Sequence, residues 1–303
     1  MSTAQKSQSK EPRTFSQVLR ILDAKWKKKN LPLEVRKVYR HINHKPVCKA
    51  LAEALDIPQA RQLGSGLSLQ DAVSWLMDWS KDTEFVLKPE EGANGQCVIR
   101  LVSLGDGRFR SLTTGSIWSH TRLLNQLGAD LERFGRRDAW IIEEFLRPAV
   151  DNGELVDDFK FYAFHGEVAC ILQRKHFLEH GKRRVRHQWY DAGWSVTDTG
   201  KHPNLIDDRI RPPAEAEQLS AAASDWSRRL LVPFSRLDLY STANGPILGE
   251  ITPRPGNASG FNDHWQHGLA VAWKRAADLL AKDLEAGKHK KLVRRHMRVA
   301  KQL

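Results

Sequence analysis

Two acidic residues, Asp238 and Glu250, have the types and spacing that a metal site requires. They lie in two runs of strand-like composition, residues 235–240 and 246–251, which Asn244-Gly245 joins. An Asn-Gly pair between such runs is a strong hairpin signal, because both residues tolerate positive φ. A hairpin there could place the two carboxylates side by side. Mg²⁺ is commonly held by one or two carboxylates together with substrate phosphates. The alternative is an ordinary surface hairpin with two solvated acids.

A lysine followed by a glycine-containing turn is a second feature that could bind phosphate. Residues 85–88 and 96–102 are predicted strands, and Lys88 ends the first of them. The turn between them contains Gly92, Asn94 and Gly95. Glycines let the backbone approach a ligand closely, and successive N–H groups can form an anion-binding nest. The segment lacks the GK[ST] signature of a Walker loop. A plain hairpin loop with an exposed lysine fits the same residues.

The composition limits the class of protein. The chain has 303 residues, of which 41% are hydrophobic and 28% charged, as is ordinary for a globular protein. No apolar run approaches the roughly 18 residues of a membrane span. The N-terminal residues 1–13 lack the apolar stretch of a secretory signal. Three widely spaced cysteines without metal-ligand spacing indicate reduced thiols. We therefore expect a cytoplasmic protein.

The net charge of +12 favours anionic partners. Much of the charge lies in residues 26–29, 182–187 and 288–303. In residues 174–202, cations alternate with Trp189, Tyr190 and Trp194, a mixture that could bind an anionic or sugar-bearing substrate or stack on single-stranded nucleic acid. A solvated surface is the third interpretation. For the tail we expect at most weak peripheral contact with a membrane.

The elements that must position these residues suggest an α+β protein. Apolar spacing predicts a disordered tail at 1–13 and a mostly helical lobe over 14–82. Strand hairpins interleaved with helices follow, which is typical of α+β folds. We expect a small lobe over 83–146, a C-terminal lobe over 147–285 and a basic tail at 286–303. Predicted helices cover 15–26, 34–42, 46–55, 69–79, 117–132, 214–231 and 264–284. Predicted strands cover 85–88, 96–102, 108–112, 139–146, 159–164, 167–173 and the two runs above, and residues 174–213 are expected to be irregular.

Four motifs in this order resemble the ATP-grasp superfamily. Asn43-His44-Lys45 is similar to the superfamily's first phosphate-contacting lysine, and FVLKPEEGANG to its second lysine and glycine loop. IEEFL at 142–146 resembles the adenine-binding linker, and the acid pair ending in GEITPRPG resembles the metal ligands. The resemblance covers about residues 40–280. Residues 157–168 and 234–252 are most similar to the TupA-like group, associated with teichuronopeptide and other polysaccharide biosynthesis.

The resemblance implies an ATP-grasp fold, in which the nucleotide lies between two α+β lobes, and a set of site residues. Those implied to contact ATP are Lys45, Lys88, Gly92, Asn94, Gly95, Glu143, Glu144, Phe145, Leu146, Asp158 and Lys160. Asp238, Glu250 and Thr252 are implied to hold one or two Mg²⁺ ions, and Arg236 and Arg254 to act in catalysis. Thr252 departs from the pattern, because many members have Asn there. Arg236 could instead form a salt bridge to Asp238.

The activity implied is that of a carboxylate–amine ligase that uses ATP. A carboxylate would attack the γ-phosphate, and the acyl phosphate would react with an amine to form an amide. The identity of the carboxylate and of the amine stays open; a polysaccharide-linked or amino-acid-type substrate is expected. Two alternatives remain: an ATP-grasp kinase that phosphorylates an acceptor, and a basic nucleic-acid-binding protein without catalysis, which is the less favoured.

Overall fold

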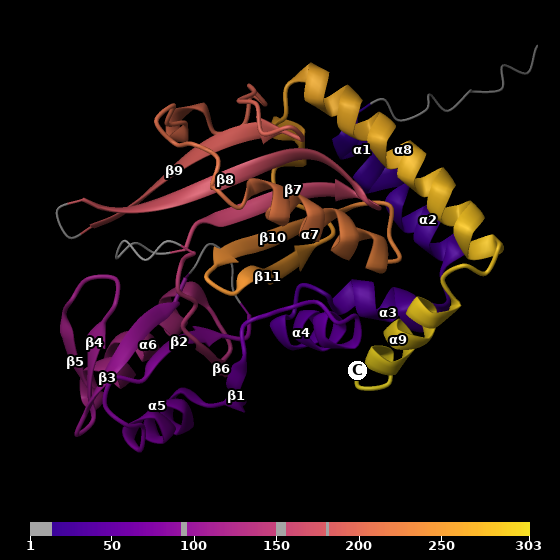
Figure 1. The fold of residues 1–303 in the computed structure, drawn as a ribbon. Coiled ribbons are helices and arrows are strands. Elements are labelled where there is room, and N and C mark those ends of the chain that lie inside the picture. The colour runs from indigo at the N-terminus through magenta and orange to yellow at the C-terminus, as the bar shows by residue number, and fades with distance from the viewer. Residues whose placement is uncertain (1–13, 92–95, 150–155, 180–181) are drawn as a thin grey trace, which may run out of the picture.

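Two antiparallel sheets lie one above the other, with helices on their outer faces and along one side (Figure 1). The computed structural model describes residues 14–91, 96–149, 156–179 and 182–303. The mixture of helices and antiparallel strands confirms the predicted α+β class. In the described ranges, none of the helices combines the length and apolar character that a membrane span requires.

The small sheet has the strand order β1-β6-β2-β3-β4-β5. Its strands are β1 (Gln62–Leu67), β2 (Glu84–Pro89), β3 (Ile99–Gly105), β4 (Arg108–Ser111), β5 (Ile117–Ser119) and β6 (Trp140–Glu144). Helices α5 (Leu69–Met77) and α6 (His120–Phe134) cover one face, where Phe85, Leu87 and Trp140 are fully buried. The alternating burial along β2 leaves Lys88 on the opposite face, toward the large sheet.

The large sheet has the strand order β11-β10-β7-β8-β9. Its strands are β7 (Asp158–Phe164), β8 (Glu167–Glu179), β9 (Lys182–Asp191), β10 (Ser235–Thr242) and β11 (Gly245–Thr252). Helix α7 (Ala216–Arg229) packs on the face that carries Phe159, Phe161 and Leu237. The other face carries polar residues at its centre and an aromatic cluster at one end, where α1 (Phe15–Ile21) and α8 (Asp263–Glu285) pack. Short 3₁₀ turns at Pro203–Leu205 and Ala258–Gly260 border this end.

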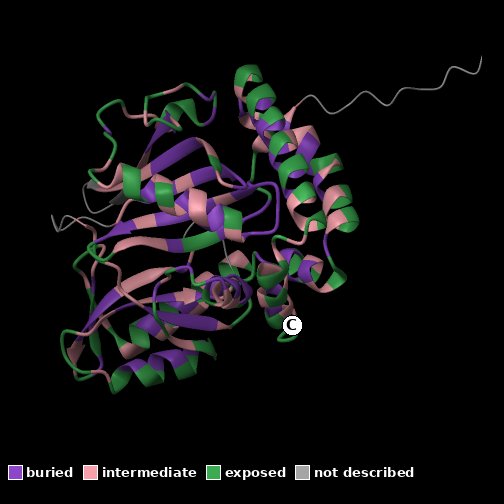
Figure 2. Cartoon of the chain, turned by 45° about the vertical axis from the view of Figure 1, so that its right-hand side comes forward, coloured by how far each residue is buried: buried purple, intermediate pink, exposed green. Residues whose placement is uncertain are grey.

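The helices of the N-terminal segment contact different parts of the protein. Helices α1 and α2 (Asp23–Asn30) pack against α8. Helices α3 (Leu33–His41) and α4 (Lys45–Ala54) pack against the C-terminal helix α9 (Lys290–Ala300) and join the core of the large sheet. Figure 2 shows the buried strands between outward helical faces that are exposed. The lobe boundaries at residues 83, 147 and 286 stay predictions.

Several predicted elements differ from the observed ones. The predicted helix 15–26 is two helices that meet at Leu22, and the start of predicted helix 117–132 is strand β5. Strand β1 was not predicted, because its sequence QLGSGL holds two glycines and no apolar alternation. The prediction of an irregular segment from 174 was wrong, since β8 and β9 form a long hairpin there. The many cationic side chains of this segment obscure the alternation of apolar and polar residues by which a strand is recognised in a sequence. The C-terminal tail is not simply solvated, because α9 buries His296 and Val299.

Candidate active site

Helix α4 links the two sheets through two lysines one turn apart. Its apolar face, with Val47, Cys48 and Leu51, belongs to the core of the large sheet. Lys45 Nζ donates to the backbone carbonyls of Pro89 and Glu90, at 2.9 and 3.1 Å, where β2 of the small sheet ends. Lys49 Nζ donates to the carbonyl of Ala60 at 3.0 Å. The helix thus fixes Lys45 beside the turn that follows β2.

A buried carboxylate, Glu143, holds two lysines on the inner face of the small sheet. Its Oε1 lies 2.6 Å from Lys49 Nζ, and its Oε2 pairs with Lys88 Nζ. Cross-strand pairing of Val86 with Glu143 places Lys88 and Glu143 on neighbouring strands. Burial opposes ionisation, but the charges of Lys88 and Lys49 hold the pKa of Glu143 below its usual value. Glu143, predicted in the adenine linker, therefore holds Lys49 and Lys88 on this face of the small sheet.

On the facing surface of the large sheet, Asp238 is the centre of an ion-pair network. Arg236 donates two hydrogen bonds to the Asp238 carboxylate, from Nε to Oδ1 at 2.6 Å and from Nη2 to Oδ2 at 2.8 Å. Lys160 on β7 pairs with Asp238 Oδ2 and lies 2.9 Å from Asp158 Oδ2. Register pairs Asp238 with Lys160 and Asp158 with Arg174, so these side chains share one sheet face. Asp238 is only 4% exposed, and a buried charge is costly unless it is paired. Arg236 and Lys160 supply that pairing.

Glu250 lies directly opposite Asp238 on β11 and has a different environment. Among the described residues it has neither a hydrogen bond nor an ion pair. Loss of hydration beside the surrounding protein raises the pKa of Glu250, and the negative charge of Asp238 raises it further. A carboxylate without a partner beside a second carboxylate offers the hard oxygen ligands that Mg²⁺ takes. The donor set of Asp238 and Glu250 therefore fits the predicted metal.

A β-bulge at Gly249 sets the direction of Glu250. Asp238 pairs with Glu250 but the next residue, Leu239, pairs with Leu248, so Gly249 is the extra residue. A Cβ on Gly249 would lie 2.7 Å from Cε2 of the Tyr240 ring and 3.3 Å from the carbonyl oxygen of Asp238. Only glycine fits this position without displacement. The hairpin itself is confirmed, with its turn at residues 243–244, one residue earlier than predicted.

The charges of the two facing surfaces act on one another. The pKa of Lys45 is lowered to about 8, first by burial and then by the charge of Lys88, while Glu250 and Glu143 oppose the shift. Glu250 of the large sheet and Lys45 beside the small sheet are thus electrostatic neighbours. The geometry brings the predicted lysines and acids to one region between the sheets. Two cations and an unpaired acid there suit a polyphosphate bound with a divalent ion.

Sequence reasoning missed Lys201, a buried cation beside Arg236. Lys201 is 5% exposed, and its Nζ lies 4.6 Å from the centroid of the Phe261 ring and 5.9 Å from that of Tyr162. Burial, and next the charge of Arg236, lowers the pKa of Lys201 to about 8. Arg174 extends this basic surface, whereas its register partner His187 is neutral, because burial and the charge of Arg174 lower the pKa of His187 to about 4. The sequence signal was absent, because a lysine after Thr199-Gly200 resembles any loop lysine.

Other predicted residues lie apart from this region or have other partners. Gly92, Asn94 and Gly95 lie outside the described residues. Glu144 accepts from the backbone N–H of Arg61 at 2.7 Å, and Phe145 and Leu146 follow β6, half-buried. Thr252 Oγ1 accepts from Arg236 Nη2 at 3.0 Å, so its hydroxyl faces the arginine. Arg254 is exposed and lies 3.7 Å from Asp23 on α2.

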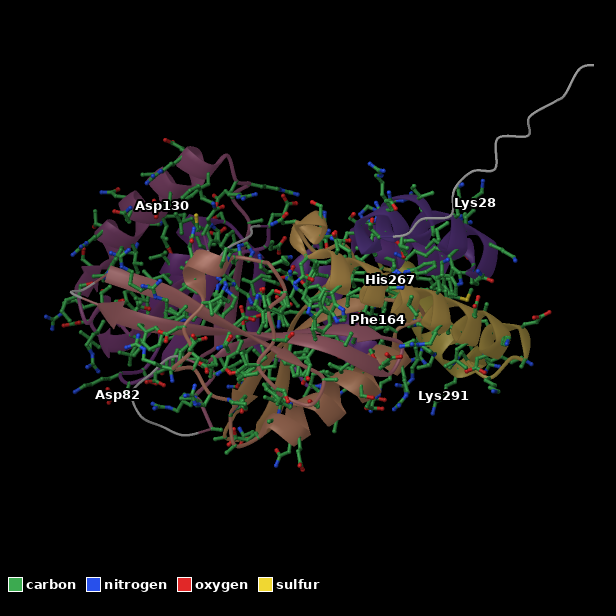
Figure 3. All side chains as sticks on the ribbon, turned by 90° about the horizontal axis from the view of Figure 1, so that it is seen from above. Lys28, Asp82, Asp130, Phe164, His267 and Lys291 are labelled. Carbon is green, nitrogen blue, oxygen red and sulfur yellow. The ribbon has the colours of Figure 1, made fainter. Side chains whose placement is uncertain are left out.

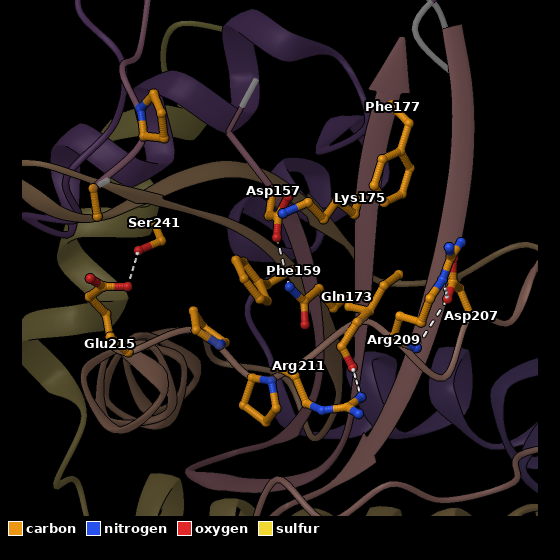
Figure 4. A pocket seen from close by; sticks show the side chains of 16 residues that line it. Asp157, Phe159, Gln173, Lys175, Phe177, Asp207, Arg209, Arg211, Glu215 and Ser241 are labelled. Atoms are coloured by element: carbon orange, nitrogen blue, oxygen red, sulfur yellow. Dashed lines mark hydrogen bonds and ion pairs between the residues drawn. The ribbon is translucent and has the colours of Figure 1, made fainter. Parts of the chain in front are cut away.

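The described residues also line a pocket of about 650 Å³ on the opposite face of the large sheet (Figure 4). It is bordered by Phe159, Gln173 and Ser241, whose register places them away from the Asp238 network. Lys175, Arg209 and Arg211 supply positive charge, and Asp157, Asp207 and Glu215 supply negative charge. Of the predicted site residues, none lines this pocket. The pocket is therefore separate from the candidate site.

Comparisons with solved structures give remote likenesses. D-alanine–D-alanine ligase from Bacillus anthracis is 14% identical with a TM-score of 0.46, covering 80% of this chain and 69% of that one. D-cycloserine synthetase DcsG is 18% identical with a TM-score of 0.44, covering 80% and 71%. The ATP-grasp ligase PsnB is 14% identical with a TM-score of 0.41, covering 80% and 60%, so this chain spans less than two thirds of it. No curated protein sequence matches the chain.

A comparison with family models gives the decisive match. The model described as TupA-like ATPgrasp matches residues 26–270, well over half of the chain. The matched range includes Lys45, Lys88, Asp238 and Glu250 and ends within α8. This confirms the predicted resemblance, the α+β ATP-grasp fold and the prediction of an ATP-grasp enzyme. The chain belongs to the TupA-like ATP-grasp family.

Proposed function

We propose that this protein is an ATP- and Mg²⁺-dependent ligase that joins a carboxylate to an amine through an acyl phosphate. The observation that carries the proposal is the adjacency of Asp238 and Glu250, with Lys45 and Lys88 on the facing side of the same region. Oxygen ligands and lysines arranged in this way suit a triphosphate and its metal. Cytoplasmic location and the use of a polysaccharide-linked or amino-acid-type substrate remain part of the proposal.

The nucleotide would lie between the two sheets. Lys45 and Lys88 would contact the phosphates, and the backbone of Phe145 and Leu146 would contact the base. Asp238 and Glu250 would hold Mg²⁺, which when bound neutralises charge that develops on the transferring phosphoryl group. Lys160 and Arg236 now pair with Asp238. Their cationic groups are therefore positioned to turn toward phosphate oxygens while remaining near Asp238.

The chemistry has two balanced steps. An oxygen of the substrate carboxylate attacks the γ-phosphorus of ATP, the bond from that phosphorus to the bridging oxygen breaks, and ADP leaves. The amine nitrogen then attacks the acyl carbon, the carbon–oxygen bond to phosphate breaks, and phosphate and a proton are released. Arg236, which is half-buried, and Lys201, which is buried, are cations at the end of the network near the aromatic cluster. We assign them to the acyl phosphate and its carboxylate precursor.

An isotope experiment separates this proposal from the kinase alternative. Candidate amino acids and uronic acids are screened for ADP release, and an active acid is then labelled with ¹⁸O in its carboxylate. The ligase predicts one ¹⁸O atom in the released phosphate and an amide product. A stable phosphorylated acceptor, with no ¹⁸O in free phosphate, would instead indicate a kinase. Absence of ADP release with all acids, together with tight and salt-dependent nucleic-acid binding, would favour the non-catalytic alternative.

A further inference from the structure

A cluster of two histidines and one aspartate lies away from the Asp238 network. His165 is in the tight turn between β7 and β8, Asp283 is near the end of α8, and His289 precedes α9. One ligand atom from each lies within 4.8 Å of the other two. Figure 3 labels Phe164 and Lys291, which lie one residue before His165 and two residues after His289. Three separate segments of the chain therefore meet at this point.

The ring nitrogens of the histidines lack the partners that buried polar atoms usually have. His165 is 8% exposed, and its Nδ1 is buried without a hydrogen-bond partner. The same is true of His289 Nε2, which lies 3.8 Å from Asp283 Oδ2, beyond hydrogen-bond reach. A buried polar atom without a partner loses its hydrogen bonds to water and gains none in the protein, which is energetically unfavourable. Two such nitrogens and one carboxylate lie close enough together for a single bound ion to contact all three.

The unpartnered nitrogens are the kind of atom through which an imidazole binds a metal. A neutral histidine ring has one donor and one acceptor nitrogen, and the unprotonated nitrogen can ligate a metal ion. Nδ1 of His165 and Nε2 of His289 are both buried and without a hydrogen-bond partner, so each can act as such a ligand.

We propose that His165, Asp283 and His289 bind a divalent transition-metal ion, with Zn²⁺ as the best match. Two imidazoles and one carboxylate suit Zn²⁺ and not Mg²⁺, which prefers oxygen ligands alone. Bonds of about 2.0–2.2 Å to Zn²⁺ place tetrahedral ligand atoms about 3.4 Å apart. Rotation of the two rings and the carboxylate closes the remaining ångström or so. Water completes the coordination.

Nearby cations limit the strength of this site. Lys288 Nζ lies 2.6 Å from Asp283 Oδ1, and its charge opposes a second cation at the same carboxylate. Arg228 acts on His165 in the same sense. The metal would use Asp283 Oδ2, leaving Oδ1 to Lys288. Removal of the Lys288 charge is therefore expected to strengthen metal binding, a result that a merely structural polar cluster would not give.

The consequence of metal binding would be mechanical. The three ligands belong to the β7–β8 turn, the end of α8 and the start of α9. Helix α9 in turn packs on α3 and on α4, the helix that carries Lys45 and Lys49. A metal bond would fasten this C-terminal helix to the large sheet. It would stabilise the protein without any direct part in the proposed ligase chemistry.

The test measures Zn²⁺ binding to the full chain by calorimetry, with excess Mg²⁺ present to occupy carboxylate-only sites. We expect one Zn²⁺ per chain and a rise of several degrees in the thermal midpoint of unfolding, because a ligand that binds only the folded state stabilises it. His289→Gln and Asp283→Asn should each weaken binding by at least about tenfold. Lys288→Gln should tighten it a few-fold. His165→Asn, chosen because Asn tolerates the left-handed backbone there (φ 46°), should also weaken binding.

A matched control uses an exposed histidine of α8, the helix that carries Asp283. His267 on α8 is exposed, and His267→Gln should leave the affinity and the thermal shift unchanged. Equal loss in His267→Gln, unchanged binding in His289→Gln and Asp283→Asn, or no Zn²⁺ binding by the wild-type chain would each overturn the proposal. These readouts do not involve ATP turnover, so they are independent of the proposed function.

Discussion

Asp238 and Glu250 lie opposite one another across β10 and β11, yet their charges are handled in different ways. Asp238 is buried and held by Arg236 and Lys160, whereas Glu250 has a raised pKa and no partner among the described side chains. Gly249, the extra residue of the β-bulge, directly precedes Glu250 on β11. Nearby cations balance the charge of Asp238, but no ion pair balances that of Glu250 among the described residues. The pair can therefore accept an additional cation.

Gly249→Ala is expected to disturb the metal ligands. The added methyl would lie 2.7 Å from the Tyr240 ring, so the ring or the bulge must shift, and Glu250 would turn with it. We expect affinity for Mg²⁺ and a non-hydrolysable ATP analogue to fall at least about tenfold, as measured by calorimetry. Gly128→Ala in α6, where a Cβ meets nothing within 4 Å, is the control and should keep normal affinity. Equal affinity in both variants would contradict the assigned role of the bulge.

Glu143→Gln is expected to lower stability in a way that depends on pH. Two partly buried lysines would lose their shared counter-charge, at a cost of about 1–3 kcal/mol near neutral pH. Because the folded-state pKa of Glu143 is depressed, its contribution is present above the unfolded value of about 4.3 and is lost as pH falls below it. Denaturant unfolding of wild type and variant should therefore differ at pH 7, and the difference should shrink only as pH falls below about 4 and through the lowered folded-state pKa. A constant difference, or the same behaviour in the exposed-site variant Glu132→Gln, would count against this explanation.

Nucleotide binding is expected to take up protons near pH 8. With its pKa lowered to about 8, Lys45 is partly neutral there, and a bound phosphate favours the charged form. Calorimetry in buffers of different ionisation enthalpy should show proton uptake by the wild type and much less by Lys45→Met. Affinity should fall as pH rises through 8. Identical proton uptake in both proteins would show that Lys45 does not face the phosphates.

Lys201→Met is expected to slow turnover while leaving nucleotide binding intact. Lys201 lies against Phe261 and Tyr162, beside Arg236 and away from Lys45 and Lys88 in the arrangement of the site. Loss of a charged contact to the acyl phosphate should reduce kcat by about ten- to hundredfold, or about 1.5–3 kcal/mol. A comparable loss of affinity for the ATP analogue would move Lys201 to the nucleotide side. Normal kcat would remove it from the site.

The sequence predicted those parts of the fold that depend on local patterns. The hairpin of Asp238 and Glu250 was accessible because turn chemistry and alternation both act over a few residues. Most helices were located for the same reason, through apolar spacing. Strand β1 was not accessible, since its partner β6 and not its own glycine-containing sequence makes it a strand.

The sequence also predicted residues of the site more readily than their partners. Order and type of motif indicated Lys45 and Lys88, but the bond of Lys49 to Glu143 depends on how α4 meets the small sheet. Lys201 is buried by Tyr162 and Phe261, which are distant in the chain. Such contacts come from tertiary packing, which no spacing rule expresses. The partners of Arg254 and Thr252 were likewise invisible before the fold was known.

The central claim is that Asp238 and Glu250 together hold the metal of the nucleotide complex. Electron paramagnetic resonance with Mn²⁺ in place of Mg²⁺ measures this directly in the presence of a non-hydrolysable ATP analogue. The wild type and the surface control Asp106→Asn should bind one or two Mn²⁺ per chain. Asp238→Asn and Glu250→Gln should each lose at least one, with circular dichroism unchanged. Full Mn²⁺ occupancy in both active-site variants would contradict the account.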